Sequence, residues 1–562
     1  MSKKQLIECV PNFSEGRNLN IIQQITDEIE SVEGVKLLDV DPGKATNRTV
    51  VTFVGEPEPV IEAAYLAIKK ASEVIDMSKQ SGEHPRMGAT DVCPLIPIAN
   101  ISMDEVVKYA HRLAERAGQN LEIPFYMYEA AATKKDRKNL ATIRAGEYEG
   151  LPEKLKNPNW KPDYGPAQFN PRAGATVIGA RDFLIAYNIN LNTTSVRRAN
   201  SVAFDIREKG RIKRKDNTLN GEILTDKNGE PLRTKGKLKG VKAIGWFIEE
   251  YGIAQISMNI TNISIAPLHK AFEETTKSAQ RRGLRVTGSE LVGLIPLKVM
   301  LDAGRYFLKK QKRSVGVSEA ELIKIAVKSL GLDELGAFDP YQKIIEYQLE
   351  SPQSAHLLNM NLRDFANETA SESPAPGGGS ISAYVGSLGI SLAAMVANLS
   401  SHKRAWDDRW EEFSEWADQA QHLKDTLLKL VDEDTHAFNT IMDAFRLPKG
   451  TPEEKAKRSE MIQSATKHAI EVPLRIMEVS MASVHIIKAM AEIGNPNSVT
   501  DAGVGMLCAR AAVHGAFLNV KINATSLKDK KYVAEVTKKG KKMLKEVDRQ
   551  EKEILKIVNS KI

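Results

Sequence analysis

The chain has 562 residues, enough for about three or four domains of ordinary size. Hydrophobic residues make up 42% and charged residues 27%, so a disordered, collagen-like or fibrous protein is excluded for the bulk of the sequence. The formal net charge of +7 is compatible with an anionic small substrate and falls short of a dedicated nucleic-acid-binding protein. Only Cys9, Cys93 and Cys508 are cysteines, too few and too scattered for a disulfide framework or a zinc site, which predicts a cytoplasmic location.

The first 360 residues alternate between short β-branched runs and stretches with the period of a helix. Ile21, Ile22, Ile25 and Ile29 fall on one face of such a stretch. A second block repeats this pattern and contains a helix that opens with Pro267. The predicted elements are strands at 5–10, 35–41, 48–55, 175–191 and 243–260, and helices over 20–29 and 267–281.

Strand signals end at about residue 360, and helix-forming residues dominate from Ser380 to the end of the chain. This change is the clearest domain boundary in the sequence, and the polar segment 349–361 before it is typical of a linker. The most apolar stretch, 381–399, is long enough for a membrane span. Its glycines and serines favour a buried core helix instead.

The segment 207–242 looks inserted and is strongly basic. It carries twelve lysine or arginine residues against five acidic ones, together with the turn signals NGE and KNGEP, so we predict a basic surface hairpin. Guidance of an anionic ligand and a plain solvated hairpin are both open interpretations. This segment is also the only support for an alternative of another class, a nucleic-acid-binding protein, because no RNP, KH or zinc-finger pattern is present.

Glycine and proline are dense in the segment 81–97, SGEHPRMGATDVCPLIP, which indicates a shaped loop. Within it, His84 lies between Glu83 and Pro85 and close to Arg86. A loop histidine beside a carboxylate and a guanidinium suits proton transfer near neutral pH, whereas a surface histidine in a turn is the plain alternative. The absence of an HExxH motif or a second nearby histidine argues against metal ligation.

Two further segments of the α/β part are candidate binding loops. Asp39 and Asp41 end a predicted strand ahead of Arg48, an arrangement found at α/β sites and equally in ordinary turns. The loop 162–176 is rich in proline and glycine and contains Arg172. Such a loop can stack an aromatic ring and bind a carboxylate, or it can be a structural connection.

The helical part contains a glycine run and a mixed helix. The run SPAPGGGSISAY at 373–384 can hold an anion at a helix start, but it lacks the GK[ST] of a Walker A loop. In the predicted helix 429–445, Asp434 lies on an apolar stripe, and Asp432 and His436 share the adjacent face. A carboxylate near apolar groups can retain its proton to higher pH and act as a proton donor, while solvated charges on a helix rim are the alternative.

Eight blocks of sequence occur in one order along the chain, and together they resemble the formimidoyltransferase–cyclodeaminase family, folate enzymes of histidine degradation. The resemblance covers essentially the full length. The blocks are IECVPNFSEGRN, LLDVDPGKATNRTVVTFVG, SGEHPRMGATDVCP, IRAGEYEGLPEKL, FLIAYNINL, GSELVGLIPLK, APGGGS and RLPKGTPEEK.

The resemblance implies a multidomain fold in which two α/β (α+β sandwich) subdomains, at 1–183 and 184–348, form a transferase. A linker at 349–361 and an all-α helical-bundle cyclodeaminase domain at 362–562 would follow. The transferase would move the formimino group from N-formimino-L-glutamate to N5 of tetrahydrofolate, and the cyclodeaminase would close the product to 5,10-methenyl-tetrahydrofolate and release ammonia. A single-activity transferase with a non-catalytic helical scaffold is the alternative.

The same resemblance implies site residues. His84 corresponds to the catalytic histidine of the family, Asp432 to the catalytic aspartate of its cyclodeaminase, and Asp41 to an acidic position near the transferase site. Two glycine-bounded stretches correspond to its folate-binding segments. Their residues are Gly165, Pro166, Ala167, Gln168, Phe169, Asn170, Pro171, Arg172, Ala173 and Gly174, and Gly236, Lys237, Leu238, Lys239, Gly240, Val241, Lys242, Ala243, Ile244 and Gly245.

The implied co-substrate is tetrahydrofolate with its polyglutamate tail, without a metal or nucleotide cofactor. The resemblance further implies a cytoplasmic homo-oligomer built from dimers, with neither nucleic acid nor membrane as a partner. The basic insert at 211–233 is longer than in the animal members of the family.

Overall fold

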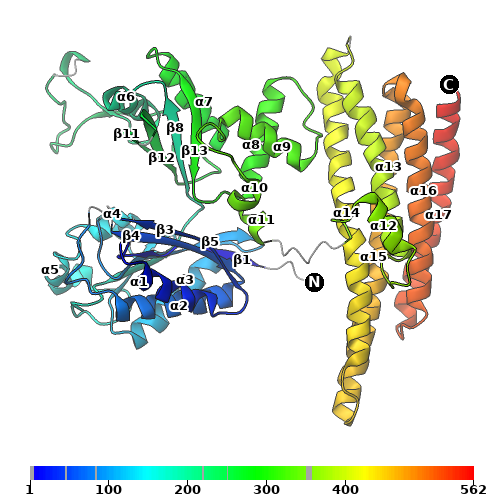
Figure 1. The fold of residues 1–562 in the computed structure, drawn as a ribbon, viewed down its shortest axis with the longest axis horizontal. Coiled ribbons are helices and arrows are strands. Elements are labelled where there is room, and N and C mark those ends of the chain that lie inside the picture. Colours follow the sequence, from blue (N-terminus) through cyan, green and yellow to red (C-terminus); the bar gives the residue numbers. More distant parts are fainter. Residues whose placement is uncertain are drawn as a thin grey trace. The chain divides into compact units, whose positions relative to one another are not determined.

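A computed structural model describes residues 5–44, 47–82, 85–217, 221–249, 251–349, 357–404 and 406–562. The chain separates into two compact units (Figure 1). The α/β unit comprises Met1–Val299 and Leu330–Leu349, and the helical unit comprises Met300–Ser329 and Glu350–Ile562. The change from mixed to all-helical structure that the sequence predicts is therefore present.

The first half of the α/β unit is built on a seven-stranded mixed sheet. Three helices cover one of its faces: α1 (Leu19–Glu30), α2 (Pro57–Val74) and α3 (Met103–Asn120) (Figure 1). Helix α1 begins where Asn18 caps it, and it buries the predicted isoleucine face. The strands are β1 (Leu6–Cys9), β2 (Asn12–Phe13), β3 (Val35–Gly43), β4 (Arg48–Gly55), β5 (Thr90–Ala99), β6 (Phe125–Glu129) and β7 (Thr176–Ala180).

Side-chain alternation along these strands separates an apolar face from a polar one. On β1, Ile7 and Cys9 belong to the core beneath the helices, so the intervening Glu8 points to the opposite face. Strand β4 follows the same rule, since Val51 and Phe53 lie in that core. The sheet thus presents polar side chains on the face that α1–α3 do not cover.

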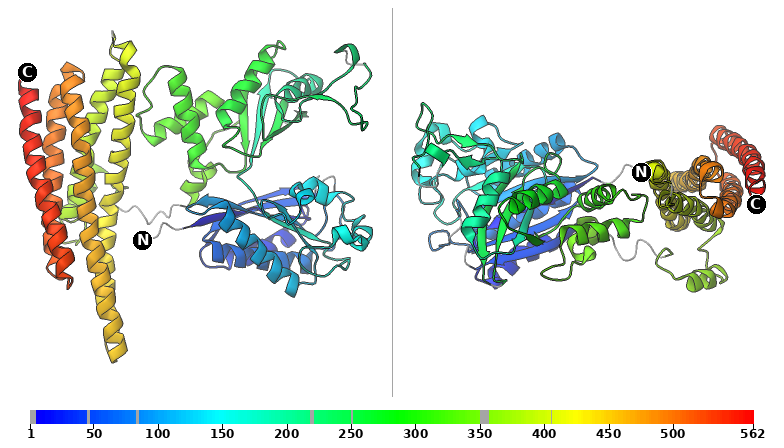
Figure 2. Two further views of the ribbon diagram at one scale, coloured as in Figure 1. Left: turned by 180° about the vertical axis from the view of Figure 1, so that it is seen from behind. Right: turned by 90° about the horizontal axis from the view of Figure 1, so that it is seen from above.

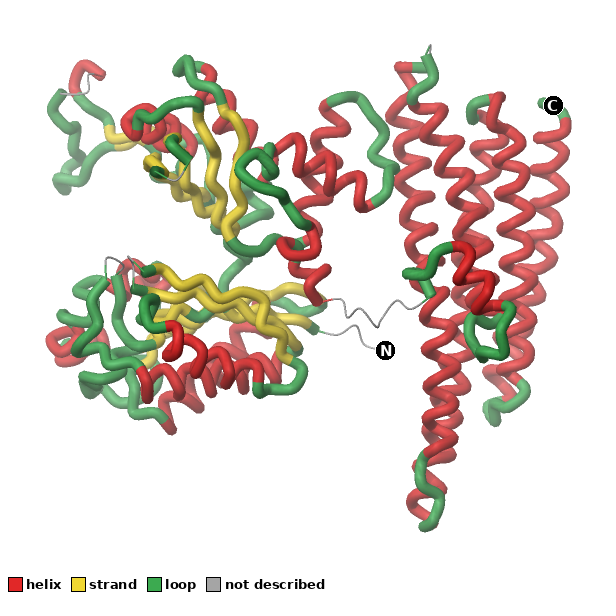
Figure 3. The backbone as a smooth tube through the Cα atoms, in the orientation of Figure 1, coloured by secondary structure: helices red, strands yellow, loops and turns green. Residues whose placement is uncertain are grey.

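The second half of the α/β unit has a four-stranded antiparallel sheet with its own helices, α6 (Val196–Ile206) and α7 (Leu268–Gln280) (Figure 3). The predicted strand at 175–191 is two strands, because residues 181–184 break it and lead into this sheet. The predicted strand at 243–260 is a hairpin, because Gly252 takes a positive φ of 64° between its arms. The strands are β8 (Ile185–Leu191), β11 (Val241–Ile248), β12 (Ile253–Ile260) and β13 (Val286–Val292).

The basic insert is a ribbon on the surface. Strand β9 (Arg211–Ile212) pairs antiparallel with β10 (Arg233–Thr234), and isolated bridges join Arg214 to Ile223 and Thr225 to Pro231 beyond them. The predicted surface hairpin is confirmed for the residues that the structure describes, 207–217 and 221–242. Short helices complete the α/β unit: α4 (Leu140–Arg144), α5 (Leu151–Lys156), α10 (Pro340–Lys343) and α11 (Ile345–Leu349).

Long helices form the helical unit, and Figure 2 shows them end-on in its right-hand view. Two segments are long and apolar enough to cross a membrane by length and composition alone. They are Gly378–Ser401, which contains the predicted apolar segment, and Pro496–Ala524. Within the fold, 61% and 50% of these windows are buried, as in core helices of a bundle. The helices are α12 (Leu362–Thr369), α13 (Gly378–Ser401), α14 (Trp410–Arg446), α15 (Pro452–Ile493), α16 (Val499–Ala524) and α17 (Lys530–Asn559).

Helices α8 (Leu297–Lys310) and α9 (Glu319–Leu330) precede the bundle in sequence, yet residues 300–329 group with the helical unit. The turn between them docks on the bundle: Ser414 Oγ accepts a hydrogen bond from Val315 N at 2.9 Å, and Asn398 Nδ2 donates to Gly316 O at 2.7 Å. Chain order places these helices inside the predicted subdomain 184–348. The subdomain limits remain predictions.

Gly316 makes this docking possible, because a Cβ there would overlap the Cβ and backbone of Ala417. We expect Gly316→Ala to lower the free energy of unfolding of the helical unit by about 1–3 kcal/mol and to speed amide exchange at Val315. Urea denaturation and hydrogen exchange would measure both effects. Gly336→Ala is the control, since a Cβ there meets nothing within 4 Å, and equal losses in the two variants would contradict the docking role.

Candidate active sites

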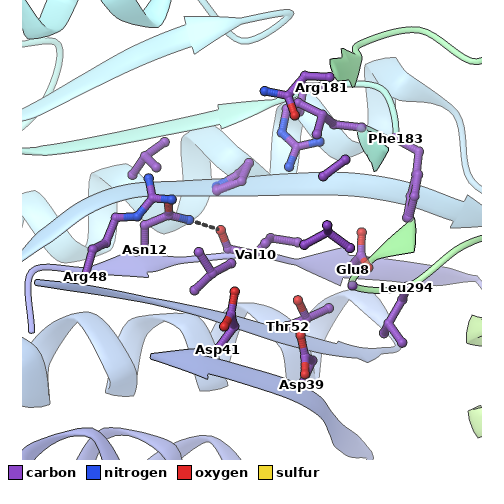
Figure 4. A pocket seen from close by; sticks show the side chains of 18 of the residues that line it. Glu8, Val10, Asn12, Asp39, Asp41, Arg48, Thr52, Arg181, Phe183 and Leu294 are labelled. Carbon is purple, nitrogen blue, oxygen red and sulfur yellow. Dashed lines mark hydrogen bonds between the residues drawn. The ribbon is translucent and has the colours of Figure 1, made fainter. Parts of the chain in front are cut away.

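The helix-free face of the seven-stranded sheet is the floor of a cavity of about 730 Å³, which we call the sheet lobe (Figure 4). Its floor carries Glu8, Asn12, Asp39, Asp41 and Arg48, all directed away from the helix-covered core. Residues of the second sheet and of the segments beside it complete the lobe: Ala186, Asn259, Glu290, Leu291, Val292, Gly293, Leu294 and Lys343.

Charges of both signs are gathered in the sheet lobe. Burial and the negative charge of Asp41 raise the pKa of Asp39, and Lys343 partly opposes this. Burial and the nearby Arg144 lower the pKa of Arg48. The lobe can therefore bind a ligand that itself carries positive and negative groups.

A second cavity of about 750 Å³, the loop lobe, adjoins the first. Pro85 lines it, as do Lys239 and Lys242 from the opposite subdomain. Five residues line both lobes and form their common wall: Tyr128, Leu140, Arg144, Arg181 and Leu184. The two lobes are thus parts of one groove between the subdomains of the α/β unit.

The predicted catalytic residue His84 lies outside the described residues, but both flanks of its loop are fixed. On one side, Asn47 Nδ2 donates to Ser81 O at 2.8 Å. On the other, Arg86 pairs with Glu149 at 2.8 Å, and its neighbour Pro85 lines the loop lobe. The described residues on either side of His84 are therefore anchored, and Pro85 lies at the loop lobe.

A buried ion pair ties this loop to the common wall. Asp91 Oδ1 accepts a hydrogen bond from Met87 N at 3.0 Å, and its carboxylate pairs with Arg144, which lines both lobes. Burial raises the pKa of Asp91 even though Arg144 opposes the shift. Loss of either partner would leave an uncompensated charge, so this pair fixes the loop firmly.

The two predicted folate-binding stretches occupy different positions. From 236–245, Lys239, Gly240 and Lys242 line the loop lobe. Residues 165–174 are described in full, and none of them lines either lobe; Gly174 instead pairs with Gly88, beside the loop that carries His84. The structure brings only the second stretch to the groove.

The helical unit has its own cavity, of about 210 Å³, at the start of α13. Asp434 of α14 lines it, and its Oδ2 accepts a hydrogen bond from Ser380 N at 2.9 Å. Burial raises the pKa of Asp434, which the hydrogen bonds from Ser380 only partly offset. The other lining residues are Pro374, Ala375, Gly377, Gly378, Thr435, Phe438, Ile441, Ala469, Asn519 and Asn523.

The predicted catalytic residue Asp432 does not line this cavity. Its Oδ1 accepts a hydrogen bond from Leu357 N at 3.0 Å, and its buried Oδ2 has no hydrogen-bond partner among the described residues. His436 is exposed and is likewise absent from the lining. The carboxyl group that the structure places beside the glycine run is that of Asp434.

Family models match nearly the whole chain. The formiminotransferase domain, N-terminal subdomain, matches residues 6–181, the formiminotransferase domain matches 186–350, and the formiminotransferase-cyclodeaminase model matches 361–542. The formimidoyltransferase-cyclodeaminase of Mus musculus is 43% identical over 93% of both chains, and that of Gallus gallus is 43% identical over 95% of both. The chain belongs to the formimidoyltransferase-cyclodeaminase family.

This membership confirms the predicted family, the α/β-then-helical fold class and the enzymatic character of the chain. The glutamate formimidoyltransferase of Streptococcus pyogenes serotype M1 is 42% identical over 54% of this chain and 94% of its own. Because the helical part matches a family model of its own, the bifunctional enzyme is favoured over a transferase with an inert scaffold.

Several groove residues were not singled out by sequence reasoning. Glu8 could have been found from strand alternation, since it is the charged residue between Ile7 and Cys9. The sequence around Arg144 and Arg181 does not indicate a binding role. Arg144 ends the short helix α4, and Arg181 follows strand β7. Their role depends on the tertiary fold.

Gly379 controls access to Asp434, because a Cβ at this position would overlap both carboxylate oxygens. We expect Gly379→Ala to displace Asp434 and to abolish any activity of this cavity, while the groove of the α/β unit keeps its own. Gly336→Ala is the control, since a Cβ there would meet nothing within 4 Å and Gly336 does not line this cavity. Separate assays of the two activities would measure the effect, and equal behaviour of both variants would contradict it.

Proposed function

We propose that the chain transfers the formimino group of N-formimino-L-glutamate to N5 of tetrahydrofolate, and then cyclises 5-formimino-tetrahydrofolate to 5,10-methenyl-tetrahydrofolate and ammonia. The observation that carries the proposal is that each unit has its own candidate site. The groove of the α/β unit offers charges of both signs, and the helical cavity offers one half-buried carboxyl group.

In the transfer step, N5 of tetrahydrofolate attacks the amidine carbon, and the bond from that carbon to the glutamate nitrogen breaks. N5 must lose a proton, and the leaving nitrogen must gain one. We assign the proton transfer to His84, whose neighbour Pro85 lines the loop lobe, because a positioned imidazole suits this task near neutral pH. Lys239 and Lys242 of the same lobe would attract the carboxylates of the folate tail.

In the cyclisation step, N10 attacks the amidine carbon carried by N5 and gives up its proton, while the imino nitrogen takes up a proton and becomes an amine. The C–NH₂ bond then breaks. Nitrogen leaves poorly unless it is protonated, so a carboxylic acid that retains its proton is required. Asp434 meets this requirement because burial raises its pKa and because it lines the cavity. We therefore propose Asp434 as the proton donor in place of Asp432.

We further propose tetrahydrofolate as the only co-substrate, self-association into dimers and higher oligomers, and a cytoplasmic location. Exposed apolar side chains on the adjoining helices α13 and α16, among them Leu388, Leu399, Leu518 and Ile522, support self-association. The free cysteines Cys9, Cys93 and Cys508 support a reducing compartment.

We expect His84→Ala to reduce formimino transfer by about 10²-fold or more, while supplied 5-formimino-tetrahydrofolate is still cyclised at the normal rate. Transfer would be followed by glutamate formation and cyclisation by ammonia release. His111→Ala is the control, because His111 lines neither lobe and its Nδ1 lies 2.9 Å from the Tyr164 hydroxyl. Loss of both activities in His84→Ala would indicate a structural role.

Asp434→Asn keeps the size of the side chain but cannot deliver a proton. We expect this variant to transfer normally, to release almost no ammonia and to accumulate 5-formimino-tetrahydrofolate.

Asp432→Asn is its counterpart on the same helix. This variant alters the acceptor for Leu357 N, so we expect a lower melting temperature with ammonia release largely preserved. Normal ammonia release by Asp434→Asn together with its loss in a folded Asp432→Asn would return the assignment to Asp432.

A further inference from the structure

Glu8 is a buried carboxyl group without a hydrogen-bond or ion-pair partner among the residues that the structure describes. It is 3% exposed, lies in the middle of β1 and lines the floor of the sheet lobe (Figure 4). No hydrogen bond or ion pair to its side chain is formed by any residue that the structure describes; Arg181 acts on it only through its charge. Buried carboxyl groups are nearly always hydrogen-bonded or paired, so the unpaired Glu8 is a candidate for binding a ligand.

The other carboxylates of the sheet lobe are hydrogen-bonded, attracted by a nearby cation or, like Asp41, exposed. Glu290, on the opposite wall, accepts hydrogen bonds from Asn188 Nδ2 at 3.1 Å, Gln255 Nε2 at 3.3 Å and the Tyr251 hydroxyl at 3.3 Å. Asp39 accepts a backbone hydrogen bond and is attracted by Lys343. The ligand that completes Glu8 must therefore bring its own N–H donors.

We propose that Glu8 binds the amidinium group of the formimino donor. An amidinium is a planar cation whose N–H groups match the two oxygens of a carboxylate, as a guanidinium does. The same lobe supplies Arg48, Arg181 and Lys343, which suit the two carboxylates of a glutamate derivative. This inference rests on the proposed transferase function and adds to it the residue that recognises the transferred group.

The environment of Glu8 makes binding of this cation depend on pH. Burial raises its pKa from 4.5 to about 7, and Arg181 opposes the shift. An arriving amidinium favours the ionised form, so binding near neutral pH releases protons from Glu8 to the solvent. Affinity for the cation is then present above pH 7 and is lost as the pH falls below that value.

Other titratable groups also face the lobe and could contribute to its pH dependence. The charged groups that line it with Glu8 are Asp39, Asp41, Arg48, Arg181, Glu290 and Lys343. Arg144 is paired with Asp91, and burial raises the pKa of Tyr128 to about 12, far above pH 7.

Calorimetric titration of the full-length chain at pH 7, in two buffers of different ionisation enthalpy, tests the inference with three probes. N-formimino-L-glutamate is the donor, formamidine carries its amidinium alone, and L-glutamate carries its carboxylates alone. We expect the wild-type chain to release protons when it binds the first two probes. Glu8→Gln should bind both about 10–100-fold more weakly and without proton release, yet bind L-glutamate and tetrahydrofolate as the wild type does.

Glu58→Gln is the control, because Glu58 pairs with Arg112 at 2.8 Å and lines neither lobe, and it should retain the proton release. Unchanged formamidine affinity and proton release in Glu8→Gln would overturn the inference, as would a selective loss of tetrahydrofolate affinity. If Glu8→Gln does not fold, Glu8→Asp is the second variant: it keeps the charge but shortens the side chain, so it should bind formamidine more weakly than the wild type. Absence of formimino transfer by the wild type would refute the proposed function. Formamidine binding tests the role of Glu8 independently of that activity.

Discussion

The arrangement of the α/β unit depends on one constraint, the strict alternation of side chains along a strand. Helices α1–α3 cover one face of the seven-stranded sheet, which leaves the other face free to carry Glu8, Asp39, Asp41 and Arg48. Such a polar face cannot be packed like a core, because each charge would need a partner. The second subdomain covers it as the opposite wall of a groove, and the space between them becomes a binding site.

In the helical unit, a glycine allows a carboxyl group to be removed from solvent. A carboxyl group on a long helix is normally solvated. Asp434 instead packs against the start of α13, where Ser380 N donates a hydrogen bond to it. This approach requires that position 379 carry no side chain. Because the helix start supplies N–H groups that favour the anion while burial favours the acid, the two effects oppose each other, and burial prevails in raising the pKa of Asp434.

Much of this architecture could be predicted from sequence, since helical period, strand alternation and the change near residue 360 are local signals. Other features could not. Asp432 and Asp434 are both on α14, roughly 200° apart around its axis, and only the packing of Leu357 and Ser380 shows which one faces the cavity. The hairpin turn at Gly252 was likewise not recognised in the sequence, because two strand-forming runs lie on either side of it and only a few residues separate them.

The two sites also differ in a way that fits consecutive chemistry. The first substrate would be small and multiply charged, so its groove must hold carboxylates and cations side by side. The second would be an amidine attached to a large ring system, whereas the helical cavity measures only about 210 Å³. That is below the usual size of a site that encloses a drug-sized molecule. Under the proposed function, only the reacting end of the folate would enter, which would place the departing nitrogen beside Asp434 and leave the rest of the ligand outside the cavity.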